Sequence, residues 1–190
     1  SSQTFKAAII GVGSANERTW DKGGGHKIGY HHAQFLQEVD RVKIATAADI
    51  NPENLAAFQR EFGLTSGYTD HREMLERDRP DIVSICTYLG THADMVIDCA
   101  RAGVKIIVCE KPLVASPAEL RAVAEVLEET GAQLGLAHLR RFKPCFEEAR
   151  NLVRAGAIGT PVMMAGGLGG WDLSEFGTHW IDLMRFIHDD

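Results

Sequence analysis

The chain has 190 residues, which is enough for one complete α/β domain and part of another. Its 45% hydrophobic and 24% charged residues are typical of a soluble globular protein, and its formal net charge of −6 argues against nucleic acid or an anionic membrane as the main partner. No apolar run approaches the roughly 20 residues that span a bilayer. The N-terminal SSQTFK has neither an initiator methionine nor an apolar signal segment, so we expect a trimmed, tagged or mature chain.

Short apolar segments alternate with amphipathic segments along the first 137 residues. The apolar segments predict strands at 5–10, 41–48, 81–86, 104–109 and 132–137. The amphipathic segments predict helices at 30–38, 52–62, 70–79, 92–102 and 117–130. Strands that alternate with helices in this way predict an α/β fold, a right-handed, doubly wound parallel (Rossmann) sheet, with a domain at 1–137.

Several helix boundaries carry capping signals. Asn51 is expected to cap the second helix, with Pro52 at its first position and Gly63 placed to close it. Ser116 begins a capping box at the start of the fifth helix. Thr91 is expected to cap the fourth helix.

The character of the chain changes after residue 137. The basic segment HLRRFKP leads into a helix expected at 144–154, followed by a strand at 161–165, the glycine-rich GGLGG and a helix at 178–188. These ~50 residues are too few to form a second core of their own. We therefore expect 138–190 to be the beginning of an α+β substrate domain, most of which is missing.

The four cysteines, Cys86, Cys99, Cys109 and Cys145, show no CxxC spacing. Two of them end apolar strands, which favours small buried thiols in a reducing compartment over disulfide or metal roles. The histidine pair His31-His32 also lacks partners at metal-ligand spacing. No metal site is predicted.

A glycine turn follows the first strand. Gly11 and Gly13 would let a pyrophosphate approach the backbone, and Asp49, at the end of the second strand, would accept hydrogen bonds from a ribose hydroxyl and repel a 2′-phosphate. The predicted cofactor is therefore NAD rather than NADP. Asn16 stands where a third glycine is expected, and Asp49 lies 36 positions after Gly13. An insertion of roughly a dozen residues within 14–28 would explain a spacing that exceeds the usual value of about 20.

A second cluster of polar residues follows the fourth strand. In open parallel sheets, ligands bind beyond the carboxyl ends of the strands, where Glu110 and Lys111 are expected and where Pro112 restricts the backbone. A strand that ends in a polar turn without function would have the same pattern.

The motifs GVG, ATAAD, SICTYLGTH, CEKP, RRFKP, RAGAIGTP and GTHWIDL occur in this order along the chain. In this respect the sequence resembles the Gfo/Idh/MocA oxidoreductase family over essentially its whole length. The combination of EKP with GxHxxD is more specific than the glycine turn. In that family the proline of EKP is often cis, and the lysine lies beside the nicotinamide and the substrate.

The resemblance implies roles for individual residues. Lys111 and His179 are the catalytic candidates, with Asp182 and Arg141 on the substrate side. Glu175 stands four residues before His179, where the family usually has an aspartate, so Glu175 would take that role, redirect it or have lost it. The residues expected on the cofactor side are Gly11, Gly13, Asp49, Thr87, His92, Glu110 and Lys111.

The resemblance also implies an activity, which is NAD-dependent hydride transfer at a hydroxyl carbon of a sugar, inositol or related polyol. Oxidation of a carbinol needs a base near its oxygen, for which histidine is suited, and a lysine ammonium can stabilise the oxygen. Two alternatives stay open, an NAD-dependent glycosidase and a non-catalytic dinucleotide-binding regulator. A homo-oligomer formed through a missing C-terminal sheet is expected by the same resemblance. Relatives include exported enzymes, so a cytoplasmic location is expected only as the default.

Simpler interpretations exist for several of these residues. His179 would also fit a helix-end histidine bonded to a backbone carbonyl, and Asp182 with Arg185 would fit an exposed ion pair. Arg141 would fit a partner for nearby acids. The insertion at 14–28 is either a loop without function or, as a sharper hypothesis, a lid over the cofactor.

Overall fold

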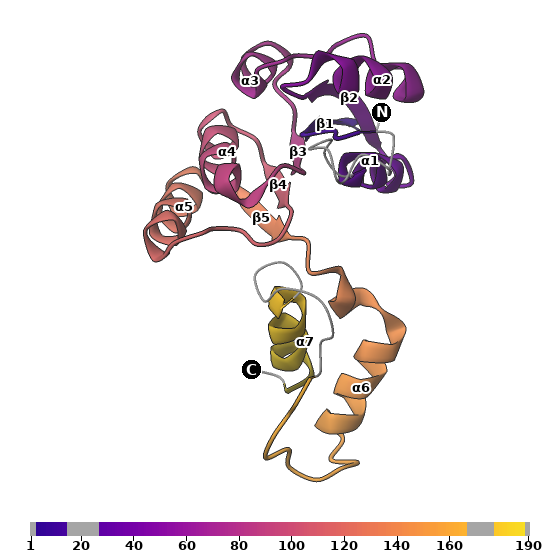
Figure 1. Cartoon of the computed structure of the whole chain (residues 1–190), viewed down its shortest axis with the longest axis vertical. Helices are drawn as coiled ribbons and strands as arrows, with labels where there is room; N and C mark the ends of the chain where they lie inside the picture. The colour runs from indigo at the N-terminus through magenta and orange to yellow at the C-terminus, as the bar shows by residue number, and fades with distance from the viewer. Residues whose placement is uncertain (1–2, 15–26, 167–176, 189–190) are drawn as a thin grey trace. The chain divides into compact units, whose positions relative to one another are not determined.

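The computed structural model describes residues 3–14, 27–166 and 177–188. The chain divides into two compact units, 1–136 and 137–190. The first unit contains a sheet flanked by helices, and the described part of the second unit consists of helices and loops (Figure 1). Within the described ranges, no helix combines the length and apolar character needed to cross a membrane.

The first unit is organised around five parallel strands. In chain order they are β1 (Phe5–Ile10), β2 (Val42–Ala48), β3 (Ile82–Ile85), β4 (Ile106–Cys109) and β5 (Gln133–Leu136). Their order across the sheet is β2-β1-β3-β4-β5. The doubly wound parallel sheet predicted from the sequence is therefore confirmed. Because the strand order reverses between β1 and β3, their carboxyl ends form the switch point at which such sheets bind ligands.

Helices cover both faces of this sheet. They are α1 (Ile28–Gln37), α2 (Pro52–Phe62), α3 (His71–Asp78), α4 (Leu89–Arg101) and α5 (Pro117–Thr130). Side chains of a strand alternate between faces, so Ala8 and Ile10 of β1 pack in a core cluster with α3, α4 and α5, while Ile9 packs with α1 and α2. In Figure 1, α4 and α5 lie to the left of the strands and α1 to the right.

Two of the predicted caps are formed as expected. The side chain of Asn51 accepts hydrogen bonds from the backbone N–H groups of Glu53 and Asn54, and Gly63 closes α2 with a φ of 64°. Ser116 accepts from the N–H of Glu119 (3.2 Å) at the start of α5. Thr91 is the exception, since α4 begins at Leu89, two residues before it. The predicted cap at Thr91 is therefore wrong.

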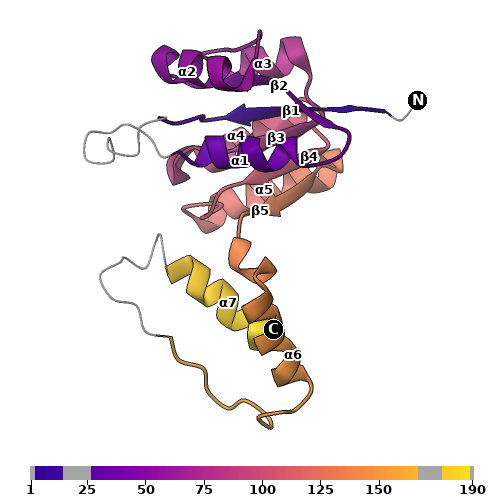
Figure 2. The ribbon, with the colours of Figure 1, turned by 90° about the vertical axis from the view of Figure 1, so that its right-hand side faces the viewer.

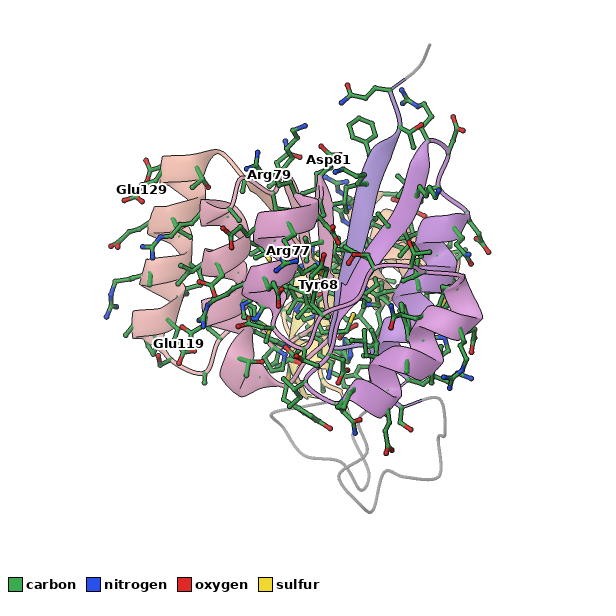
Figure 3. All side chains as sticks on the ribbon, turned by 90° about the horizontal axis from the view of Figure 1, so that it is seen from above. Tyr68, Arg77, Arg79, Asp81, Glu119 and Glu129 are labelled. Carbon is green, nitrogen blue, oxygen red and sulfur yellow. The ribbon has the colours of Figure 1, made fainter. Side chains whose placement is uncertain are left out.

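Charged residues close the amino edge of the sheet by pairing with one another. The Asp81 carboxylate, just before β3, accepts hydrogen bonds from the backbone N–H of Lys6 (3.0 Å) and from the Lys105 ammonium (2.8 Å). These bonds, chiefly that from Lys105, outweigh the effect of burial and lower the pKa of Asp81. Glu119 lies in the first turn of α5, which follows the carboxyl end of β4. Figure 3 shows Asp81, at the amino edge, and Glu119 at opposite ends of the unit.

The second unit contains a 3-10 helix, η2 (Leu139–Phe142), followed by α6 (Pro144–Arg154) and α7 (Thr178–His188). Figure 2 shows α6 and α7 side by side, and they are in contact. The strand predicted at 161–165 is not formed. Val162 and Met163 are 97% and 82% exposed. The described part of this unit contains no other strand with which 161–165 could pair, so the backbone N–H and C=O groups of an extended segment would bond to water.

The cysteines occupy two different environments. Cys86, Cys99 and Cys109 are buried free thiols, whereas Cys145 is exposed. Burial raises the pKa of Cys109 to about 12 and also raises the pKa values of Cys86 and Cys99. The expectation of buried thiols is confirmed for these three and wrong for Cys145, because α6, which carries it, has no buried residue.

Alkylation of the native protein should therefore be selective. A pKa near 12 leaves about one thiolate in 10⁴ at pH 8, and the thiolate is the reactive form. We expect iodoacetamide at pH 8 to modify Cys145 rapidly and the three buried thiols only after unfolding, as followed by mass spectrometry of the peptides. Modification of Cys109 as fast as that of Cys145 in the native protein would contradict this environment.

Candidate dinucleotide and catalytic site

The loop after β1 is shaped by two glycines. Gly11 and Gly13 have φ values of 79° and 73°, a region that side chains disfavour. A Cβ on Gly11 would also lie 2.5 Å from Thr87 Cγ2 and 3.1 Å from the Cys86 carbonyl carbon and oxygen. Gly11 thus allows the loops that follow β1 and β3 to pack directly against each other.

A third glycine, Gly29, completes this loop and was missed by the sequence analysis. It is the second residue of α1, and a Cβ there would lie 2.7 Å from the Cα and oxygen of Val12 and 2.8 Å from the oxygen of Gly11. This close approach of helix and turn is the function of the third glycine in a dinucleotide fingerprint. The signal available in the sequence was a glycine at the start of the helical pattern.

The position of Gly29 explains the spacing of the fingerprint. Asp49 lies 20 positions after Gly29, close to the usual distance of about 20 from glycine motif to acid. The additional residues therefore fall between the second and third glycines. Residues 15–26, which include Asn16 and most of the segment 14–28, lie outside the described residues, so the choice between a loop without function and a lid stays open.

Asp49 contacts the glycine turn directly. One carboxylate oxygen accepts a hydrogen bond from the N–H of Gly13 (3.1 Å), and the other accepts from the N–H of Asn51 (2.8 Å). An ionised carboxylate has about four lone-pair sites, so these two bonds orient Asp49 and leave sites for the hydroxyls of a ribose. The hydrogen bond to Gly13 thus fixes the Asp49 carboxylate relative to the glycine turn.

The loop after β3 contributes Thr87, and the first turns of α4 contribute His92. The single hydroxyl proton of Thr91 has two acceptors within reach, Thr87 Oγ1 (2.8 Å) and the Tyr88 carbonyl oxygen (2.9 Å), so the Thr91 side chain bonds to this loop and does not cap α4. His92 is 1% exposed, with Nδ1 2.7 Å from the Pro112 oxygen and Nε2 2.9 Å from the Thr87 oxygen. Both ring nitrogens face the protein, so this geometry favours a structural role for His92 over direct contact with a cofactor.

The turn after β4, residues 110–112 (the EKP turn), lies beside these loops. The Lys111–Pro112 bond is cis, as the family resemblance implied. The Glu110 carboxylate lies 3.1 Å from His32 Nε2 and accepts from the N–H of Lys111 (3.2 Å). Burial alone would raise the pKa of Glu110, but the hydrogen bond and charge of His32 together with Lys111 lower it. His32, only 8% exposed, is a second residue that sequence reasoning missed.

Strand register brings the three loops together. Ile10 of β1 is paired with Ile85 of β3, and Ile85 with Cys109 of β4. The residues that follow these strands, Gly11 and Glu110 among them, therefore meet at one edge of the sheet. The glycine turn, the N-terminus of α1 and the oriented Asp49 carboxylate fit a dinucleotide, because the lack of a Cβ at Gly11 and Gly29 lets this turn pack closely on the loop after β3 and on α1.

The second unit holds the remaining candidates. The single Nε–H of Arg141 is shared between the two Asp182 oxygens (2.9 and 2.8 Å), and Nη2 donates to Oδ1 (2.6 Å). The pKa of Arg141 is raised, mainly by these hydrogen bonds and further by the negative charge of Asp182. Asp182 thus joins α7 to η2 and pairs with Arg141 rather than with Arg185. Bidentate pairs of this kind fix the geometry of both groups.

Two histidines lie beside this ion pair. The rings of His138 and His179 are edge to face with centroids 5.7 Å apart, and His138 Nδ1 lies 3.8 Å from an Asp182 oxygen. His138 was not singled out from the sequence as a functional residue. Glu175 lies outside the described residues. Lys111 belongs to the first unit and His179 to the second, and their cooperation in one site stays a prediction.

A glycine turn, a closely packed helix and an acid at the end of β2 define a dinucleotide-binding Rossmann domain. Residues 5–138 match the family model described as "Oxidoreductase family, NAD-binding Rossmann fold". The chain belongs to this family, the Gfo/Idh/MocA oxidoreductases.

Two inositol dehydrogenases and one crystal structure are among the known proteins similar to this chain. The chain is 36% identical over 162 residues to a scyllo-inositol 2-dehydrogenase (NAD(+)) from Bacillus subtilis (85% of this chain, 43% of that protein) and 30% identical over 135 residues to a myo-inositol 2-dehydrogenase from Thermotoga maritima (71% and 40%). The crystal structure of a myo-inositol 2-dehydrogenase from Lactobacillus plantarum superposes with a TM-score of 0.83 at 24% identity, covering 98% of this chain and 57% of that chain. The chain thus spans less than half the length of the two relatives.

The contact between α1 and the glycine turn can be tested at Gly29. Gly29→Ala should lower the free energy of unfolding by ~1–3 kcal/mol through overpacking and should weaken dinucleotide binding, because the added Cβ meets backbone atoms of both Gly11 and Val12 in the glycine turn. The matched control is Gly90→Ala, since Gly90 is also the second residue of its helix and a Cβ there meets nothing within 4 Å. Thermal unfolding and titration with NADH would check both variants; equal behaviour would contradict the role given to Gly29.

Proposed function

We propose that the protein is an NAD-dependent dehydrogenase that oxidises a hydroxyl carbon of an inositol, sugar or related polyol. The observation that carries the proposal is the position of Lys111, one residue beyond Glu110, at the same carboxyl edge of the sheet as the glycine turn and Asp49. The names of the two relatives, both inositol dehydrogenases, support the substrate class. Dinucleotide binding is assigned to the first unit and substrate binding to the second.

In this mechanism a bound nicotinamide would supply the hydride acceptor. The Lys111 ammonium would donate a hydrogen bond to the substrate oxygen and favour its loss of a proton. His179 would accept that proton, since an imidazole is a suitable base near neutral pH. Glu175 is proposed to assist His179. Arg141 and Asp182 form a bidentate pair, so we assign them to substrate binding as a unit, with Asp182 orienting Arg141.

Two finer proposals concern the cofactor and the assembly. Asp49 would accept hydrogen bonds from the ribose hydroxyls and repel a 2′-phosphate, which favours NAD over NADP. The relative from Bacillus subtilis, whose name specifies NAD(+), is consistent with this preference. The homo-oligomer expected from the family resemblance stays a prediction.

The role of Lys111 can be tested in the full-length protein with a panel of inositols, sugars and glycosides. Lys111→Ala should lower kcat by ~10²–10⁴-fold while the Kd for NADH changes little, because the ammonium acts on the reacting oxygen. Lys105→Ala is the matched control, since Lys105 lies before the same strand and pairs with Asp81 at the opposite edge. NADH absorbance and mass spectrometry of products would follow the reaction.

The outcomes of that experiment separate the possible activities. NADH formation with one polyol that disappears only in Lys111→Ala supports the dehydrogenase. Product formation without NADH would indicate an NAD-dependent glycosidase. Dinucleotide binding with no product of either kind would indicate a regulator.

The role of Asp49 predicts a change in cofactor preference. Asp49→Ser should raise the ratio of kcat/KM for NADP to that for NAD at least tenfold, because it removes the charge that repels a 2′-phosphate. Asp40→Ser removes the same charge at the other end of β2 and should leave the ratio unchanged. The proposal fails if the wild type already prefers NADP, or if both variants change the ratio equally.

A further inference from the structure

The EKP turn is held by buried histidines from two different helices. His92 of α4 contacts the Pro112 carbonyl on one side of Lys111, and His32 of α1 contacts the Glu110 carboxylate on the other. Both imidazoles are at least nine-tenths buried as residues, at 1% and 8% exposure. We infer that His92 and His32 are positioning residues, which fix the backbone on either side of Lys111 and thereby the place of its side chain. This inference rests on the proposed function of Lys111.

The shorter of the two contacts is that of His92. Its Nδ1 lies 2.7 Å from the Pro112 oxygen and its Nε2 lies 2.9 Å from the Thr87 oxygen. The two carbonyls lie beyond the ends of neighbouring strands, β4 and β3, where strand pairing no longer holds the backbone. A single ring therefore joins the EKP turn to the loop that packs against Gly11. Either tautomer donates one of these hydrogen bonds, and the protonated ring donates both.

His32 acts on the other side through Glu110. The Glu110 carboxylate contacts His32 Nε2 with one oxygen (3.1 Å) and accepts the Lys111 N–H with the other (3.2 Å). His32 comes three residues after Gly29, in the helix whose first turn packs on the glycine turn. The same helix thus contacts both the phosphate-binding turn and the turn that carries Lys111.

Histidine is suited to this task because its two nitrogens lie on opposite sides of a rigid ring with only two side-chain torsions. Loss of the contacts made by His92 and His32 would free the EKP turn without removing any group that touches cofactor or substrate. A displacement of about 1 Å at a reacting group can cost ~10²-fold in rate. The expected consequence is a loss of kcat with little change in cofactor affinity.

Three substitutions of His92 test the inference in the full-length protein. His92→Phe keeps size and burial but removes both hydrogen bonds. An asparagine amide lies near the position of Nδ1 and a glutamine amide near that of Nε2, so His92→Asn can retain the bond to Pro112 and His92→Gln the bond to Thr87. His71→Phe is the matched control, because it removes a part-buried histidine that bonds Asp98 (2.9 Å), on α4, and contacts no residue of the EKP turn.

Two measurements are needed. Hydrogen exchange of the Lys111, Leu113 and Val114 amides reports on the EKP turn whether or not a substrate is known. Steady-state kinetics with the polyol that the substrate panel identifies, together with the Kd for NADH, report on its function. We expect His92→Phe to accelerate exchange about tenfold or more and to lower kcat about 100-fold, with the Kd for NADH within about twofold of wild type. His92→Asn should retain more turnover than His92→Gln.

The hydrogen-exchange result tests the link to the EKP turn without any activity, and kcat tests its consequence for catalysis. Unchanged exchange in His92→Phe, or equal acceleration in His71→Phe, would overturn the positioning role. Faster exchange with unchanged kcat would also overturn it. If His92 served only to fill space in the core, His92→Asn and His92→Gln would lose turnover equally. That result would contradict the higher turnover expected of His92→Asn. If the wild type oxidises no polyol, the proposed function fails, and selective acceleration of exchange in His92→Phe would still establish the hydrogen-bonded link to the turn.

Discussion

The whole candidate site depends on the reversal of strand order between β1 and β3. From β1 the chain crosses to β2 on one side and returns to β3 on the other, so the loops after β1, β3 and β4 meet at one edge. Gly11 can pack against Thr87 only because these two loops are neighbours. Polar groups in these loops have lost the strand ladder as a hydrogen-bond partner, and they bond to side chains or to a ligand instead.

The two edges of the sheet use their acids in different ways. At the amino edge, Asp81 is paired with the Lys105 ammonium and the Lys6 backbone, and its lowered pKa reflects those structural bonds. At the carboxyl edge, Asp49 and Glu110 accept bonds from backbone N–H groups of Gly13 and Lys111. Glu110 also contacts His32 (3.1 Å), whereas both hydrogen bonds that Asp49 accepts, from Gly13 and Asn51, come from backbone N–H groups. A carboxylate oriented in this way by backbone donors, with no lysine or arginine in these bonds, suits a site that must recognise a ligand.

In the described part of the second unit, where few residues are buried, an ion pair fixes the positions of side chains. Its helix α6 buries no residue, and the contact between η2 and α7 includes the bidentate Arg141–Asp182 pair. The Arg150 guanidinium packs on Phe186 at 4.6 Å from the ring centroid. Directional contacts of this kind orient His138 and His179 beside the ion pair where hydrophobic burial is limited.

The sequence by itself determined the features that depend on local chemistry. Strand and helix positions follow from short apolar runs and from caps such as Asn51 and Ser116, whose partners lie two or three residues away. The motif order was enough to identify the family, and Gly11, Gly13, Asp49 and Lys111 could be selected by their places at strand ends. Thr91 and the expected strand at 161–165 were wrong because a cap depends on where a helix starts and a strand on a neighbour to pair with.

Only the tertiary structure decided which distant groups meet. Gly29 takes the place of the third glycine because α1 packs on Val12, a contact that spacing along an interrupted motif did not indicate. His32 and Glu110 are 78 residues apart, and His92 and Pro112 are 20 apart, so no local pattern relates them. A histidine in an amphipathic helix has the same sequence signature whether it packs in the core, binds a cofactor or bonds to a turn. Its role is set by the atoms that its two ring nitrogens face once the sheet has brought the loops together.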